Sequence, residues 1–72
     1  MSDSTANLRI TLNGQPRQVR PRTTVADLVR ESRLREDQVA VEMNRRLVRS
    51  ADYGREVADG DVVELVTFVG GG

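Results

Sequence analysis

The stretch Leu8-Arg-Ile-Thr-Leu-Asn-Gly-Gln-Pro-Arg-Gln-Val-Arg-Pro21 decides how the chain begins to fold. Residues 8–12 alternate apolar and polar side chains, which is typical of a strand with one buried face. Asn13-Gly14 is a favoured centre for a tight hairpin turn. Residues 17–21 then return as a second strand that ends at Pro21, because proline has no N–H for a strand ladder. The sequence therefore predicts an opening β-hairpin.

A helix start follows the hairpin directly. Thr24 stands where an N-cap is expected, and Asp27, three residues later, approximates a capping box. The apolar residues Val25, Leu28 and Val29 have the i, i+3, i+4 spacing of one helix face. The pattern predicts a helix over residues 25–33.

Three further strands are predicted after the helix. Residues 39–43 alternate again, and Asn44-Arg45-Arg46 reads as a turn into a short strand at 47–48. Asp59-Gly60-Asp61 is a strong turn signal, and it precedes a last strand over 62–69. The element order is therefore β-β-α-β-β-β.

That order predicts an α+β fold of the β-grasp, or ubiquitin-like, class. A single amphipathic helix would cover one face of a mixed sheet of four to five strands, whose first and last strands pair in parallel. We expect a flexible N-terminal segment over 1–7, the folded domain over 8–69 and a flexible glycine tail over 70–72.

The last strand has an outer face with unusual side chains. Glu64 belongs in solvent, which sends Val63, Leu65 and Thr67 inward and places Val66 and Phe68 outside. An exposed apolar pair on a small protein often marks a partner interface. The alternative is that this face packs under the loop of residues 50–58, and the sequence leaves both interpretations open.

The composition excludes several function classes. Eleven basic residues balance eleven acidic ones, which argues against a nucleic-acid binder and against docking on anionic membranes. The absence of Cys and His excludes disulfides and the usual zinc sites, so we expect no metal. With no Lys either, an enzyme would lack the commonest acid–base and nucleophilic groups. The polar start resembles neither a signal nor a transit peptide, so a cytoplasmic location is expected.

Several segments resemble the ThiS sulfur carriers of thiamin biosynthesis. The most specific is the closing Val63-Glu-Leu-Val-Thr-Phe-Val-Gly-Gly-Gly72, supported by Val39-Ala-Val-Glu-Met-Asn44 and Asp59-Gly-Asp61. Leu12-Asn13-Gly14 and the segment 24–28 also match, so the resemblance spans residues 8–72. Arg49 and Tyr53 stand where such carriers often have proline and tryptophan, which puts the shape of that loop in doubt.

The resemblance implies a chemistry for the glycine tail. The carboxylate of Gly72 would be adenylated by a ThiF-type enzyme that uses ATP and Mg²⁺, and then converted to a thiocarboxylate with sulfur from a donor enzyme. A ThiG-type thiazole synthase would receive the sulfur, so the chain would be a carrier and not an enzyme. Gly70 and Gly71, which lack Cβ atoms, would thread the partner's channel. Val66, Phe68 and Val69 would form the partner interface.

The chain itself offers no nucleotide site, because it has no glycine-rich phosphate loop with Lys. No bound cofactor is therefore expected. Alternatives remain open: a sulfur carrier for molybdopterin, cysteine or thiosugar formation, or a ubiquitin-like binding module that is never activated.

Overall fold

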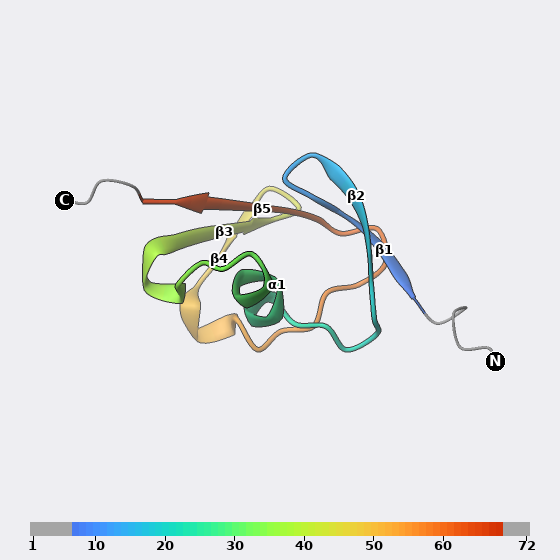
Figure 1. Cartoon of the computed structure of the whole chain (residues 1–72), viewed down its shortest axis with the longest axis horizontal. Helices are drawn as coiled ribbons and strands as arrows, with labels where there is room; N and C mark the ends of the chain where they lie inside the picture. The colour runs from blue at the N-terminus through green and yellow to red at the C-terminus, as the bar shows by residue number, and fades with distance from the viewer. Residues whose placement is uncertain (1–6, 69–72) are drawn as a thin grey trace.

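Five strands form one mixed sheet in the order β2-β1-β5-β3-β4 in the computed structural model, which describes residues 7–68 (Figure 1). The helix α1 packs against one face of this sheet. The expected α+β, β-grasp architecture and its β-β-α-β-β-β order are confirmed. The strands are β1 (Leu8–Leu12), β2 (Gln15–Val19), β3 (Val39–Met43), β4 (Arg46–Val48) and β5 (Val62–Thr67), the helix is α1 (Val25–Glu31), and two short 3-10 turns are η2 (Glu36–Gln38) and η3 (Ser50–Asp52).

The last strand, β5, lies in the middle of the sheet. It pairs in parallel with β1, where Thr11 is opposite Val62 and Leu12 is opposite Val63. On its other side it runs antiparallel to the whole of β3, from Met43 opposite Val63 to Val39 opposite Thr67. The predicted parallel pairing of the first and last strands is therefore confirmed.

Two-residue turns close both hairpins, and two strands have other bounds than predicted. Asn13 and Gly14 have φ values of 51° and 82°, and Asn44 and Arg45 have φ values of 54° and 71°. Two consecutive positive φ values are the mark of a type I′ turn, whose twist matches that of the strands. Because the first turn is this short, β2 begins at Gln15 and ends at Val19, earlier than predicted. In the second hairpin Arg46 belongs to β4 and not to the turn.

The helix α1 begins as predicted and ends early. The Thr24 hydroxyl accepts a hydrogen bond from the Asp27 N–H at 3.1 Å, and the Asp27 carboxylate accepts one from the Thr24 N–H at 2.9 Å. This reciprocal pair is the predicted capping box. The helix stops at Glu31, because Ser32 is its C-cap and Arg33 takes a left-handed φ of 62°.

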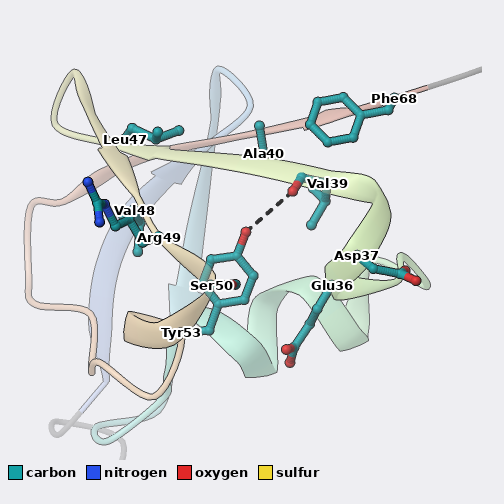
Figure 2. A pocket seen from close by; sticks show the side chains of 10 residues that line it. All are labelled: Glu36, Asp37, Val39, Ala40, Leu47, Val48, Arg49, Ser50, Tyr53 and Phe68. Atoms are coloured by element: carbon teal, nitrogen blue, oxygen red, sulfur yellow. Dashed lines mark hydrogen bonds between the residues drawn. The ribbon is translucent and has the colours of Figure 1, made fainter.

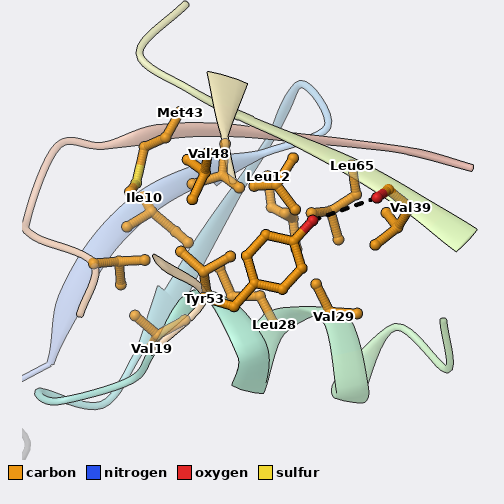
Figure 3. Close-up of a cluster of buried hydrophobic side chains, with 14 residues drawn as sticks. Ile10, Leu12, Val19, Leu28, Val29, Val39, Met43, Val48, Tyr53 and Leu65 are labelled. Atoms are coloured by element: carbon orange, nitrogen blue, oxygen red, sulfur yellow. Dashed lines mark hydrogen bonds between the residues drawn. The ribbon is translucent and has the colours of Figure 1, made fainter. Parts of the chain in front are cut away.

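The core lies between α1 and the sheet face that it covers (Figure 3). Tyr53 enters this core from the loop after β4, and its hydroxyl donates a hydrogen bond to the Val39 carbonyl at 3.3 Å. Burial, and to a lesser degree the charge of Glu36, raises the pKa of Tyr53. The buried apolar residues are Ile10, Leu12, Val19, Val25, Leu28, Val29, Val39, Val41, Met43, Val48, Tyr53, Val57, Val63 and Leu65.

Candidate functional site

The end of β5 presents two large apolar side chains to solvent. Val66 is 55% exposed and Phe68 is 62% exposed, whereas Val63 and Leu65 are buried on the opposite face. The predicted orientation of these four residues is confirmed. Thr67 was expected to face inward and is exposed. It lies beyond the end of β1, so only β3 flanks it at this end of the sheet.

Neighbouring strands extend this apolar surface. Ala40 is directly opposite Val66, and Leu47 on β4 is 71% exposed. Figure 2 shows Ala40, Leu47 and Phe68 along one side of the sheet. We call Ala40, Leu47, Val66 and Phe68 the outer patch. The sequence interpretation missed Ala40 and Leu47. A two-residue turn after Met43 would have revealed Leu47, because it pairs Leu47 with the outward-facing Glu42.

The loop of residues 50–58 does not cover the outer patch. It packs against the start of α1, where Ala26 N–H donates to the Tyr53 carbonyl at 2.8 Å and Val25 N–H donates to the Arg55 carbonyl at 3.0 Å. Val57 on the same loop is buried in the core. The interpretation that this loop shields the outer face is therefore wrong.

Two like charges lie beside the outer patch. Glu42 and Glu64 are directly opposite each other on β3 and β5, and both are exposed. Like charges in this position repel one another. The ion pairs of the described residues join other groups: Arg17 with Glu31, Arg30 with Asp27, and Arg35 with Asp37. The outer face therefore combines apolar surface with negative charge, and a complementary surface would carry a basic side chain.

A pocket of about 450 Å³ opens along the edge of β3, next to the outer patch (Figure 2). β4 pairs with β3 only from Val41 to Met43, which leaves the first part of β3 without a strand on that side. Phe68, Ala40 and Leu47 line the pocket, together with Tyr53. The charged residues Glu36, Asp37 and Arg49 also line it, so the pocket combines apolar and charged side chains.

Within residues 7–68 no group of three acidic side chains is arranged to hold a metal ion. The same segment contains no helix long and apolar enough to cross a membrane. The remaining predicted site residues, Val69, Gly70, Gly71 and Gly72, lie outside the described residues. The tail roles assigned to them stay predictions.

Two comparisons with known proteins point to the ThiS family. The model of the ThiS family matches residues 10–72. The crystal structure of the thiamine biosynthesis protein ThiS from Geobacter metallireducens superposes with a TM-score of 0.71 and 30% sequence identity, over 90% of this chain and 100% of that one. Thiazole synthases from Paramagnetospirillum magneticum and Magnetococcus marinus are each 36% identical over 66 residues, which is 90% of this chain. The chain spans only 20% of the length of these two relatives.

Proposed function

The chain belongs to the ThiS family, and on that premise we propose that it is a sulfur carrier whose Gly72 carboxylate is activated by a separate enzyme. The observation that carries the proposal is that the family match continues through the closing glycines to residue 72. The outer patch supports it, since Val66 and Phe68 present an apolar surface, and only Val69 separates Phe68 from those glycines in the sequence.

The proposed chemistry follows from the weakness of a carboxylate as an electrophile. A terminal carboxyl group has a pKa of about 3.3–3.7, so at neutral pH it is an anion that resists nucleophilic attack. A carboxylate oxygen attacks the α-phosphorus of ATP, pyrophosphate leaves, and the resulting acyl-adenylate has AMP as a good leaving group. Sulfide-level sulfur (HS⁻) from the donor then attacks the acyl carbon and displaces AMP, so that a C–S bond replaces the C–O bond and the product is the thiocarboxylate. A ThiF-type enzyme supplies the ATP and Mg²⁺ site.

The glycines give the carboxylate its access. Glycine has no Cβ, so Gly70, Gly71 and Gly72 would pass through a channel that larger residues would block. From Val69 to Gly72 an extended chain reaches roughly 10 Å. The folded domain then stays outside the partner's active site, and the outer patch with Val69 holds it there.

We further propose that a thiazole synthase receives the sulfur. The names of the two thiazole synthases support this recipient over molybdopterin, cysteine or thiosugar formation, because each contains a region similar to this chain. If that region is a carrier, each of these two proteins joins carrier and recipient in one polypeptide, where they meet at high effective concentration. The carried sulfur would thus enter the thiazole moiety of thiamin.

Intact mass tests the proposal. The protein is incubated with a ThiF-type adenylating enzyme, ATP, Mg²⁺ and a sulfur donor, and a gain equal to the exchange of one oxygen for sulfur is expected. Deleting Gly72, or adding one residue after it, should abolish the gain while the circular dichroism spectrum stays unchanged. No gain for the unaltered chain with any such enzyme would favour a binding module that is never activated.

The recipient is tested in a second step. Thiocarboxylated protein is mixed with a thiazole synthase and its small-molecule substrates, and the mass should return to that of the carboxylate. A molybdopterin synthase large subunit serves as the matched control and should leave the mass unchanged. Sulfur loss with the control and not with thiazole synthase would overturn this recipient.

A further inference from the structure

Backbone hydrogen bonds extend over a longer part of β5 on its β3 side than on its β1 side. On the β3 side the ladder runs to the end of the strand, where Phe68 N–H donates to the Gln38 carbonyl at 3.0 Å. In a β-strand, successive residues direct their backbone groups to opposite sides. The residues of β5 that direct theirs toward β3 are therefore Val62, Glu64, Val66 and Phe68. Val63, Leu65 and Thr67 direct theirs to the opposite side, toward β1.

The neighbour on that opposite side stops halfway along β5. Asn13 N–H donates to the Val63 carbonyl at 2.9 Å, and the chain then turns away through Gly14. The Leu65 N–H is still bonded, because it donates to the side-chain oxygen of Asn13 at 2.8 Å. Beyond it, the carbonyl of Leu65 and both backbone groups of Thr67 face no strand. Figure 1 shows β5 continuing past the β1–β2 turn with β3 as its remaining neighbour.

The other edges of the sheet have features that hinder pairing with a further strand. On β2, Pro16 points away from β1 and has no N–H to offer. On β3, the Tyr53 hydroxyl bonds the edge carbonyl of Val39. The β4 edge is only three residues long. Proteins normally protect strand edges with such devices, or with charged residues.

The open end of β5 carries none of these devices within the described residues. Its side chains are Val66, Thr67 and Phe68, with neither a charge nor a proline among them. An uncharged, extended edge with alternating N–H and C=O groups is a template for another strand.

We propose that this edge, at Leu65–Thr67, accepts an extended strand of the adenylating enzyme and so continues the sheet into the partner. The inference rests on the proposed function, because that function supplies the partner. A strand paired with Thr67 would lie beside Val66 and Phe68, so one segment would both bond the backbone and contact the outer patch. Backbone pairing would also fix the direction in which β5 leads into the glycines, which a purely apolar contact would not.

Amide hydrogen exchange of the Thr67 N–H tests the edge directly. In the free protein this amide should exchange rapidly, whereas the Phe68 amide, bonded to Gln38, should be protected. With saturating ThiF-type enzyme, the Thr67 amide should exchange at least ~10-fold more slowly. An unchanged Thr67 rate in the complex overturns the proposal, as does concentration-dependent protection in the free protein, which would show pairing with a second copy.

A pair of variants adds a test by affinity. Thr67→Pro removes the N–H, and the domain should tolerate it because that N–H has no acceptor within residues 7–68. Thr67→Val keeps the N–H and is the matched control. We expect the proline variant to bind the enzyme about tenfold more weakly and the valine variant to bind nearly as the unaltered chain does. Equal affinities overturn the proposal, and if the proline variant does not fold, the exchange measurement on the unaltered chain decides.

The same experiments separate the two proposals. If the unaltered protein neither binds the enzyme nor gains sulfur, the proposed function fails and the edge proposal fails with it. If it binds and is modified while the Thr67 amide keeps its free exchange rate, the function stands and only the edge pairing is wrong.

Discussion

The side-chain oxygen of Asn13 accepts a hydrogen bond from the backbone N–H of Leu65 at 2.8 Å, across a sequence separation of 52 residues. Asn13 occupies the left-handed first position of the β1–β2 turn, with a φ of 51°. Its side chain therefore continues the parallel ladder for one more bond after its backbone has left the sheet. Asn44 bonds β5 at the other hairpin, where its side-chain oxygen accepts from Val62 N–H at 2.9 Å and its own N–H donates to the Val62 carbonyl at 2.8 Å. Two turn residues thus hold β5 from both sides.

We expect Asn13→Ala to lower the free energy of unfolding by about 1–3 kcal/mol, because it removes the bond to Leu65 and strains a positive φ. Asn13→Gly removes the bond and keeps the φ accessible, so its loss should be smaller, about 1 kcal/mol. Urea unfolding measures both. If the glycine variant is more stable than the unaltered chain, the side-chain bond contributes less to stability than the relief of the positive φ.

Arg45→Gly should stabilise the protein. Arg45 sits at the second turn position with a φ of 71°, where type I′ turns prefer glycine. Relief of this strain should raise the free energy of unfolding by about 0.5–1 kcal/mol. Arg46→Gly is the matched control, since Arg46 is already in β4, and it should destabilise the protein. A thermal melt in which the two variants shift alike would contradict the assignment of this turn.

Phe68→Ala should separate binding from stability. Because Phe68 is largely exposed, its truncation should change the free energy of unfolding by less than about 0.5 kcal/mol. Affinity for the adenylating enzyme should fall at least ~10-fold if Phe68 is an anchor of the interface. Leu65→Ala, on the buried face of the same strand, should instead cost about 2–5 kcal/mol of stability. Unchanged affinity in Phe68→Ala would remove Phe68 from the interface.

The capping box should make stability depend on pH in acid. Hydrogen bonds from the backbone and side chain of Thr24, followed by the charge of Arg30, lower the pKa of Asp27 below its ordinary value of 3.8. The folded state then binds this proton more weakly than the unfolded state. The ionised Asp27 carboxylate therefore stabilises the fold fully above its unfolded pKa of about 3.8, and this stabilisation is lost as the pH falls through the folded pKa.

Asp27→Asn measures this effect. The unaltered chain should be the more stable of the two at neutral pH, and the difference should shrink as the pH is lowered below the unfolded pKa. Urea unfolding at several pH values gives the comparison. A stability difference that is constant from neutral pH down to pH values well below 3.8 would show that the carboxylate charge is irrelevant to the cap.

Local sequence patterns were enough for most of the fold. Asn13-Gly14 has few backbone options, and Thr24 with Asp27 satisfies helix-end groups over a three-residue span, so both were visible without tertiary information. The alternation across 39–43 likewise gave β3 its bounds as the structure has them. In each case the interaction that decides the structure is short in sequence.

The errors arose where distant contacts decide the outcome. The early end of α1 depends on Arg33 taking a left-handed φ, which is uncommon for arginine and has no local signal. Thr67 is exposed and lies beyond the end of β1, and the place of Leu47 in the outer patch depends on the register of β4. The side-chain bonds of Asn13 and Asn44 to β5 depend on the order of the strands, which a two-residue motif does not specify.

The central position of β5 also has a mechanical consequence. Its parallel bonds to β1 and its antiparallel bonds to β3 lie across the strand axis. Traction applied along β5 from its far end would load these bonds together in shear, instead of peeling them apart one at a time. The domain should therefore resist unfolding when a partner pulls on this end of β5.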